Sequence, residues 1–326
     1  MIERSHKILP CLCGIVLICS GQKASVSSQP SPIDTLVSCT QVEQLLQRVD
    51  TTYRHFRVDS LLRFEDKRVQ YQYRQAGVKA WERADFDGNG RMDLLVTGNY
   101  YEEGGKVLCL LDMDNGKLIV EPFDRQFYRS CPIVRVEYSG KQPLLRYQDY
   151  APSVLEIDSL KNKEDFLLTH KFGGFVEYNP KPLAGVVWDS ITYQSEFVYD
   201  EYEQFKLTMS SNGKATYRFQ GWPVLQKRKK RFEALTTQIT AGSLDSINVL
   251  IAYMASSRFK NRYEVQMNHV PYTQLTIAYH TGAKVNLLDV GEQGTFGLVR
   301  LYTLLRQLRK TQLWHPISSS KRQTVK

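Results

Sequence analysis

The sequence contains no apolar run long enough to cross a bilayer. Its longest such run, ILPCLCGIVLI at residues 8–18, has 11 residues, whereas a spanning helix needs about 20. A basic start precedes this run and small residues follow it, so the pattern predicts a cleaved signal peptide over residues 1–21. We therefore expect a soluble exported protein, periplasmic or secreted, without a transmembrane span. A buried first helix is the alternative.

Cysteine is scarce, and half of it lies in this first segment. The chain has six Cys, of which three fall within residues 1–21. A lipid anchor on Cys19 is less favoured, because Ile18 places a branched side chain where a lipoprotein signal carries a small residue. The other three cysteines allow at most one disulfide within one chain. Cys109 with Cys131 is the best pair, since an exported chain can keep such a bond, and three buried free thiols are the alternative.

The short motifs that mark several enzyme classes are also missing. No His-Glu-x-x-His or Cys-x-x-Cys pair occurs, and the six His are scattered. Neither a Gly-x-Ser-x-Gly elbow nor a Walker-type phosphate loop is present. A dispersed catalytic triad has no fixed order in sequence, so a hydrolase acting on an envelope polymer, with its site between two domains, stays open. It is the alternative to a binding or scaffolding module of the cell envelope.

What the sequence does contain is typical of a globular protein. Its 326 residues are 42% hydrophobic and 24% charged, enough for two domains. Ser, Pro and Gln dominate residues 22–38, which predicts a flexible leader. Apolar residues then recur every three or four positions from 40 to 64, which predicts a helix, and period-two or short apolar runs predict strands. These strands are expected at 69–73, 93–98, 106–113, 117–123, 133–138 and 143–148.

The pattern changes near Pro182, where hairpins alternate with helical stretches. We predict an α+β fold: an N-terminal helix plus an antiparallel β-rich unit over 39–181, then a ββαββα-type domain over 182–316 with helices packed on an antiparallel sheet. Residues 317–326 form a basic tail. The second domain has predicted strands at 188–198, 204–209, 214–220, 274–280 and 283–290, and predicted helices at 229–238, 243–257 and 295–314.

Positive charge is concentrated in the second domain. Residues 183–326 contain 19 Lys and Arg against 10 Asp and Glu, whereas residues 22–182 contain 22 against 23. The densest run, Lys227 to Arg231, fits either an anionic partner or, more simply, a solvated helix start. The expected partner is therefore an envelope protein or an anionic polymer. Nucleic acid is not expected, because no aromatic and basic binding pattern accompanies the charge.

One loop carries a specific chemical signal. Counted from Asp85, the stretch ADFDGNGRMDLLVTG at 84–98 places side-chain oxygens at positions 1, 3, 5 and 9 and the Arg91 carbonyl at position 7. This alternation suits a hard cation that takes six to eight oxygen ligands, so we predict structural Ca²⁺ rather than Mg²⁺. Gly90 stands where such a loop must turn sharply, and an Asp/Asn/Gly-rich hairpin turn without metal is the alternative. The predicted ligands are Asp85, Asp87, Asn89, Arg91 and Asp93.

Two neighbouring features set limits on this prediction. The twelfth position of the loop is Val96, so the bidentate glutamate of an EF-hand is missing. The similar stretch Asp112-x-Asp114-Asn115-Gly116 breaks off after two carboxylates, and it is interpreted as a hairpin turn. The sequence therefore predicts one metal loop, placed between strands.

Residues 79–98, with the motif WERADFDGNGRMDLLVTG, resemble the calcium loop of integrin-type FG-GAP repeats. In that family an aspartate-rich loop joins two strands of a propeller blade. The resemblance implies that Asp85, Asp87, Asn89 and Asp93 are side-chain ligands and that Arg91 binds through its carbonyl. Only one such loop occurs, and no repeat of 20–50 residues is present, which excludes a complete propeller.

Residues 185–315 are similar to an uncharacterised domain family of exported bacterial proteins. The family segment is I-x-Y-x-G followed by D-x-G, and Ile277, Tyr279, Gly282, Asp289 and Gly291 match it with one additional residue before the first glycine. Many members of that family have a Cys-Tyr-Gly-x-Cys-Pro run, but the corresponding stretch here has no cysteine. The resemblance therefore implies a fold and an exported location, and no activity.

Overall fold

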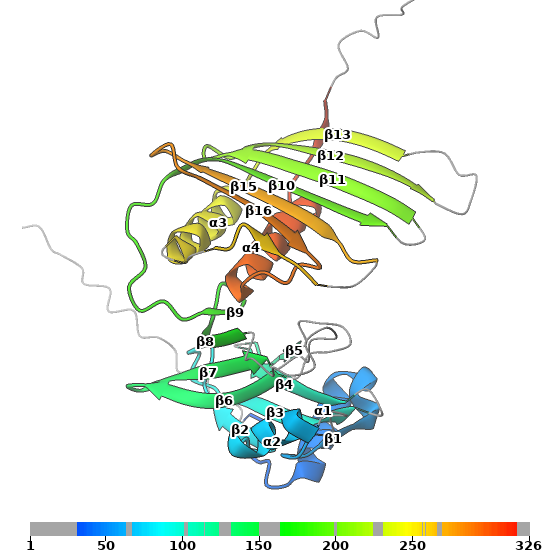
Figure 1. Cartoon of the computed structure of the whole chain (residues 1–326), viewed down its shortest axis with the longest axis vertical. Coiled ribbons are helices and arrows are strands. Elements are labelled where there is room, and N and C mark those ends of the chain that lie inside the picture. Colours follow the sequence, from blue (N-terminus) through cyan, green and yellow to red (C-terminus); the bar gives the residue numbers. More distant parts are fainter. Residues whose placement is uncertain are drawn as a thin grey trace, which may run out of the picture.

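The protein is mostly β-sheet, arranged as 17 strands in three sheets within the part of the chain that the computed structural model describes (Figure 1). Strands hold 46% of these residues and helices 23%. The predicted α+β class is therefore wrong. The described residues are 31–62, 67–100, 104–113, 115–123, 132–149, 164–198, 201–223, 231–255, 257, 259–265 and 269–317.

The first helix is shorter than predicted. Helix α1 (Cys39–Val49) starts after Ser38, whose side chain accepts a hydrogen bond from the Gln41 backbone N–H. It ends at Asp50, where the backbone turns extended and the side chain caps a 3₁₀ turn, η1 (Thr51–His55). Strand β1 (Phe56–Val58) follows immediately. The periodic apolar residues from Val42 to Phe56 thus lie in three different elements, which all contribute to the same core.

Chain packing begins before the predicted end of the leader. Ile33 and Leu36 are buried in the cluster that α1 forms with the first sheet. The predicted strand at 69–73 is also wrong, since it lies in helix α2 (Lys67–Gln75). Tyr73 is buried there while Tyr71 is exposed. Residues two positions apart share one face in a strand but lie on nearly opposite sides of a helix, so this difference in burial fits the helix.

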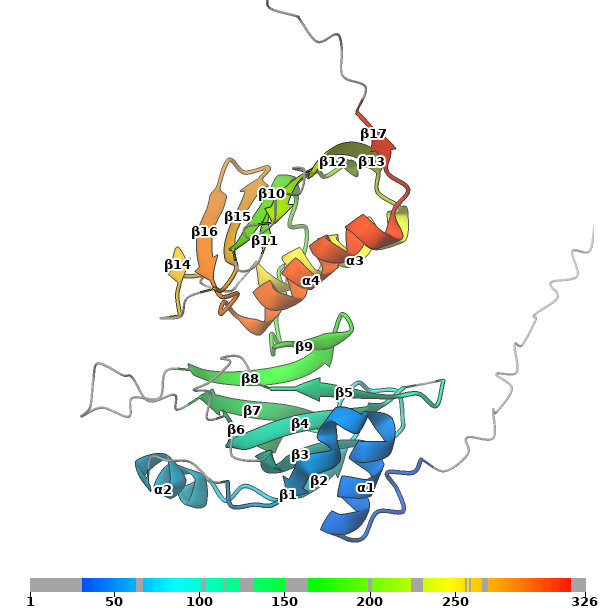
Figure 2. The same ribbon diagram turned by 90° about the vertical axis from the view of Figure 1, so that its right-hand side faces the viewer.

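The first sheet has five strands, and both of its faces are buried. One face packs on α1 and the other on the second sheet, as Figure 2 shows for the stacked lower layers. Strand β3 is therefore a nearly continuous buried run, with only its last residue partly exposed. The strands are β2 (Trp81–Ala84), β3 (Asp93–Tyr100), β4 (Gly105–Asp112) and β5 (Leu118–Pro122), with β1 and β2 both paired to β3.

The second sheet is a four-stranded antiparallel meander. Its inner residues pack against β3 and β4 in a core rich in aromatic side chains. The predicted strands at 133–138 and 143–148 are its first hairpin. Its strands are β6 (Pro132–Ser139), β7 (Gln142–Asp149), β8 (Glu164–Lys171) and β9 (Gly174–Glu177).

The third sheet has eight strands, and both remaining helices cover the same face of it (Figures 1 and 2). Helices α3 (Ala241–Met254) and α4 (Phe296–Thr311) bury their apolar side chains there. The strand order is β14-β16-β15-β10-β11-β12-β13-β17. The bounds are β10 (Trp188–Val198), β11 (Glu201–Ser210), β12 (Lys214–Pro223), β13 (Arg231–Gln238), β14 (Arg262–Tyr263), β15 (Tyr272–Tyr279), β16 (Lys284–Val290) and β17 (His315–Pro316).

The main error in the second domain is the helix predicted at 229–238. Its described part, residues 231–238, is strand β13, which pairs with β12 from Lys214↔Gln238 to Gly221↔Arg231. Four consecutive antiparallel strands therefore precede α3, in place of the two expected in a ββαββα domain. Residues 227–230 of the basic run and residues 318–326 of the tail lie outside the described residues.

Helix α4 joins the second and third sheets. The Glu177 carboxylate at the end of β9 accepts hydrogen bonds from the backbone N–H groups of Phe296 (2.5 Å) and Gly297 (2.9 Å). The Phe296 ring packs edge-on against Tyr147 of the second sheet, 5.0 Å between centroids. Val176 belongs to the core of the third sheet, so the chain has continuous packing on both sides of the predicted boundary near 182.

The structure also bears on the predicted disulfide and on the expected absence of a transmembrane helix. Cys109 is a buried free thiol, so the structure lacks the predicted bond to Cys131, which lies outside the described residues. Cys39 is exposed and free, which also contradicts three buried thiols. None of the described helices has the length and hydropathy to cross a membrane. The predicted signal peptide and Cys19 are outside the described residues.

Candidate metal centre

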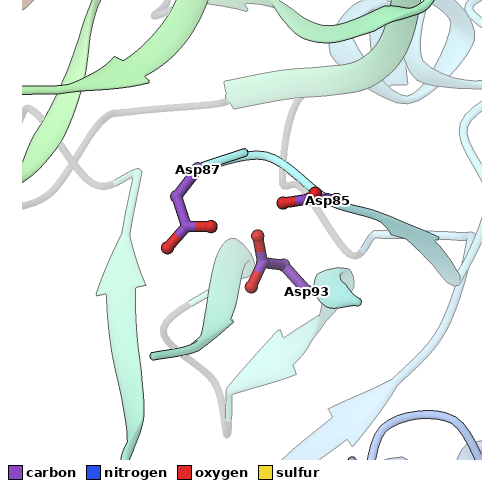
Figure 3. A group of neighbouring side chains, drawn as sticks. All are labelled: Asp85, Asp87 and Asp93. Carbon is purple, nitrogen blue, oxygen red and sulfur yellow. The ribbon is translucent and has the colours of Figure 1, made fainter. Parts of the chain in front are cut away.

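Three predicted ligands converge in the loop between β2 and β3. Each of Asp85, Asp87 and Asp93 offers a carboxylate oxygen, and these oxygens lie within 4.8 Å of one another. Figure 3 shows the three side chains directed toward one common space. The ladder between the strands holds Ala84 opposite Asp93, so the two ends of the loop are fixed side by side. The cluster has the donor set to hold a metal ion.

The loop backbone requires its two glycines. Gly88 and Gly90 have φ angles of +75° and +84°, a left-handed region that residues with a Cβ seldom adopt. The prediction that the chain turns sharply at Gly90 is confirmed. The Asp85 carboxylate is held inside this turn, because it accepts backbone hydrogen bonds from Gly88 (2.8 Å), Asn89 (3.1 Å) and Gly90 (2.8 Å).

Asp93 is the most deeply placed of the three acids. It is fully buried, and its two oxygens accept backbone hydrogen bonds from Phe86 and Asp112, both 2.8 Å. The pKa of this carboxyl is raised to about 7, mainly by burial; the backbone donors of Asp112 and Phe86 lower it, and the nearby charge of Asp87 raises it. A bound cation would supply the opposite charge that this buried carboxylate lacks.

The other two predicted ligands are oriented by the same loop. The amide oxygen of Asn89 accepts a hydrogen bond from the Arg91 backbone N–H (2.8 Å), which leaves it a second lone pair. Its amide nitrogen donates to the Asp87 carboxylate (3.1 Å) and to the Asp112 carbonyl (2.7 Å). The ligand roles of Asn89 and of the Arg91 carbonyl stay predictions.

Sequence reasoning missed Asp112. It was interpreted as part of a hairpin turn, but its side chain is fully buried and binds Arg91 in a bidentate ion pair, at 2.8 Å to Nε and 2.9 Å to Nη2. Ser31 donates a further hydrogen bond to the same carboxylate. The available signal was its position: an acid that ends an otherwise buried strand, β4, needs a buried partner.

The open side of the loop borders a groove of about 660 Å³. Residues of the loop form one wall, including Asp85, Asp87 and Gly88. The hairpin between β6 and β7 and the end of β8 form the opposite wall, with Tyr138, Lys141 and His170 among the lining residues. An ion from solvent therefore has an access route to the carboxylates.

The residues of the second resemblance serve the fold of the third sheet. Ile277 is buried in the helix-covered core, and Gly282 takes a φ of +83° in the turn between β15 and β16. Asp289 is fully buried and accepts hydrogen bonds from the backbone of Gln293 (2.6 Å) and Gly294 (2.9 Å) and from the Tyr302 hydroxyl (3.1 Å). It shapes the turn that leads into α4.

Comparisons with known proteins do not assign the chain to a family. No protein-family model, no curated protein and no solved structure matches the chain. The resemblances to FG-GAP loops and to an exported bacterial family therefore stay predictions.

Proposed function

We propose that this chain is a calcium-binding protein whose ion is held by the loop between β2 and β3. The observation that supports this proposal is the convergence of the Asp85, Asp87 and Asp93 carboxylates within 4.8 Å. Asn89 and the Arg91 carbonyl would complete a set of five protein oxygens, with solvent from the groove filling further positions. Ca²⁺ accepts six to eight such ligands in irregular geometry, whereas Mg²⁺ demands a near-ideal octahedron and keeps its waters.

The ion has a structural role in this proposal. The loop is attached to β4 through the Arg91–Asp112 ion pair and the Asp93 carboxylate, so an ion bound there ties the β2–β3 connection to the first sheet. A loop that fills most of the coordination shell with protein oxygens has little room to polarise a substrate. We place the protein in the cell envelope, as an exported binding or scaffolding module for an envelope protein or an anionic polymer.

The experiment compares thermal unfolding of the full-length chain in about 2 mM CaCl₂ with unfolding in a chelator. A ligand that binds only the native state stabilises it by about 2.7 kcal/mol at 100 times its Kd, so calcium should raise the midpoint clearly. Asp87→Asn should remove most of this rise. Its matched control is Asp165→Asn, a half-exposed carboxylate on β8, which should keep the full rise.

Magnesium at the same concentration provides the second arm. We expect it to raise the midpoint much less than calcium, since the loop offers no rigid octahedral frame. A midpoint that calcium leaves unchanged would refute the proposal. Equal shifts by the two ions would refute the choice of calcium and leave a general divalent site.

A further inference from the structure

The eight-stranded sheet has one face that no described element covers. Side chains alternate between the two faces of a strand. Residues such as Tyr193 of β10, Leu207 of β11 and Ile277 of β15 are buried against α3 and α4, and both helices lie on that one side (Figure 2). Within each strand, the residues that alternate with these buried ones therefore point away from the helices. We call this surface the outer face.

The outer face is polar and regular. Five threonines form one row across five strands, since Thr192 is paired with both Thr276 and Thr208, and the pairing continues through Thr216 to Thr236. Glutamines and basic residues form the adjoining rows. The described outer-face side chains of these five strands include three cations and one carboxylate, namely Lys206, Lys214, Arg218 and Glu196.

Two of these cations are placed directly against each other. Lys206 of β11 is the register partner of Arg218 of β12, and side chains opposed in this way have Cβ atoms about 5 Å apart. Like charges in opposed positions destabilise a sheet. Among the residues that the structure describes, neither cation forms an ion pair with a carboxylate. The protein thus keeps a repulsive pair at this place in an otherwise regular sheet.

A hollow of about 470 Å³ lies over this pair. Amide side chains surround it on three strands, and Phe232 of β13 stands at its edge with 65% of its surface exposed. Its outer-face lining includes Gln194, Gln204, Lys206, Arg218, Gln220 and Phe232. One carboxylate, Glu233, also lines it, and this group is paired with Arg309 at 2.8 Å. The hollow is open along the sheet, so it fits a segment of an extended polymer better than an enclosed small molecule.

We propose that this hollow binds an acidic oligosaccharide, a sugar chain that carries carboxylate groups. Arg218 and Lys206 supply the charge for a carboxylate, with the guanidinium able to bind it in a bidentate manner. The glutamine amides provide both donors and acceptors for sugar hydroxyls. The exposed ring of Phe232 offers an apolar, electron-rich face on which the C–H side of a sugar ring can stack. The bound anion relieves the repulsion between the two cations.

This proposal uses no residue of the metal loop, so failure of calcium binding would leave it standing. It is tested by isothermal titration of the full-length chain with oligogalacturonate and oligoalginate, and with maltohexaose as a neutral chain. We expect binding of an acidic chain and none of the neutral one. Affinity should fall as salt is raised, because partly exposed charges are screened.

Variants connect the binding to the hollow. Lys206→Gln combined with Arg218→Gln should weaken binding by at least about tenfold, the effect of losing a charge-assisted contact. Phe232→Ser should weaken it about threefold through the lost ring contact. Lys214→Gln is the matched control, since it removes a cation from the same face of β12 outside the hollow, and it should change affinity less than about twofold.

The proposal would be overturned if neither acidic chain bound, or if maltohexaose bound equally well. It would also be overturned if the double variant and Lys214→Gln lost affinity to the same extent, since the charge of the face as a whole would then be responsible. A single-stranded oligonucleotide of equal charge is the last arm. If it bound as tightly, and lost affinity in the same double variant, the assignment to sugar would be wrong.

Discussion

At the scale of single residues, buried aspartates accept hydrogen bonds that hold the turns of this protein in place. Asp93, Asp112 and Asp289 are fully buried, and each has backbone or side-chain donors around it. A carboxylate removed from water without such donors would cost several kcal/mol. Asp93 begins β3, Asp112 ends β4, and Asp289 is the last residue but one of β16. The local turn is thus organised around a charged acceptor rather than around apolar contacts.

The Asp112→Asn variant tests the pair behind the metal loop. It removes the negative charge that Arg91 binds, and it replaces one acceptor oxygen by an NH₂ group that faces the donors of Arg91 or Ser31. We therefore expect a loss of about 2 kcal/mol in the free energy of unfolding. Urea unfolding in a chelator measures this loss without contribution from calcium. Asp165→Asn, on the exposed side of β8, should lose less than about 0.5 kcal/mol. Equal losses in both variants would contradict this account of Asp112.

We expect Asp289 to make the stability of the protein depend on pH. Burial raises the pKa of this carboxyl, although the donors from Gly294, Gln293 and Tyr302 lower it. A raised pKa means that the folded state holds the proton more tightly than the unfolded state, so the stability contribution is present in acid and is lost as pH rises through the folded pKa.

Asp289→Asn removes this titration. We therefore expect its destabilisation, relative to the unmodified chain, to be largest in acid and to shrink as pH rises toward neutrality. Unfolding free energies from urea titrations at several pH values give the difference. A penalty that grows with pH would contradict the raised pKa.

The candidate site was largely predictable from residues close in sequence. Asp85, Asp87 and Asp93 lie within one short loop, and their spacing alone indicates that they converge. Asp112 was missed because its role depends on β4 lying beside the loop, which is a tertiary relation. Asn115 and Gly116, which follow it closely in sequence, do form a turn. Asp112 was therefore interpreted as part of that turn.

At the scale of elements, the local sequence pattern predicted the wrong element where pairing with a distant strand determines the structure. Residues 229–238 begin with a basic run, which resembles a solvated helix start. Tertiary context overrides such a preference: Phe232, Ala234 and Thr236 take alternate positions on the outer face of β13, each opposite a residue of β12. The strands β3 and β4 were predicted correctly, since long apolar runs buried on both faces have no competing local interpretation.

The opposed cations on β11 and β12 lead to a prediction for the sheet itself. Arg218→Glu turns the repulsive pair with Lys206 into an attractive one, so we expect the free energy of unfolding to rise by about 0.5 kcal/mol at low salt. Urea unfolding at low and high salt measures the rise and its screening. Lys214→Glu, whose register partner is Gln238, should show no such rise. A stability loss in Arg218→Glu would mean that the pair is not repulsive.

At the scale of the whole molecule, helix α4 unites the two halves. Its first turn contacts the second sheet through Phe296, and its apolar stripe from Leu298 to Leu308 is buried against the third sheet. Arg300 donates to the Phe172 carbonyl in the turn between β8 and β9. Asn179 adds backbone and side-chain hydrogen bonds to Tyr253 of α3. The sequence indicated a boundary near 182 but gave no signal for these contacts across it.

Glu177→Gln tests this junction. The glutamine has one acceptor oxygen for two helix N–H groups and no charge to favour the positive end of the helix, so we expect a loss of about 1 kcal/mol. Urea unfolding followed by two probes, near-ultraviolet and far-ultraviolet circular dichroism, shows the loss and whether the transitions separate. Glu264→Gln, in an exposed surface pair, serves as the control. An unchanged stability in Glu177→Gln would mean that the cap contributes nothing.

The hydrogen bond from Ser31 to Asp112 joins residues 81 positions apart, and it has a consequence for how the protein matures. Closing such a separation is an entropically late event in folding. The acids of the β2–β3 loop reach their final surroundings only after β4 has been synthesised and docked. Affinity for the ion is thus a property of the finished sheet, and a short peptide copy of residues 79–98 lacks the groups that hold the ligands in place.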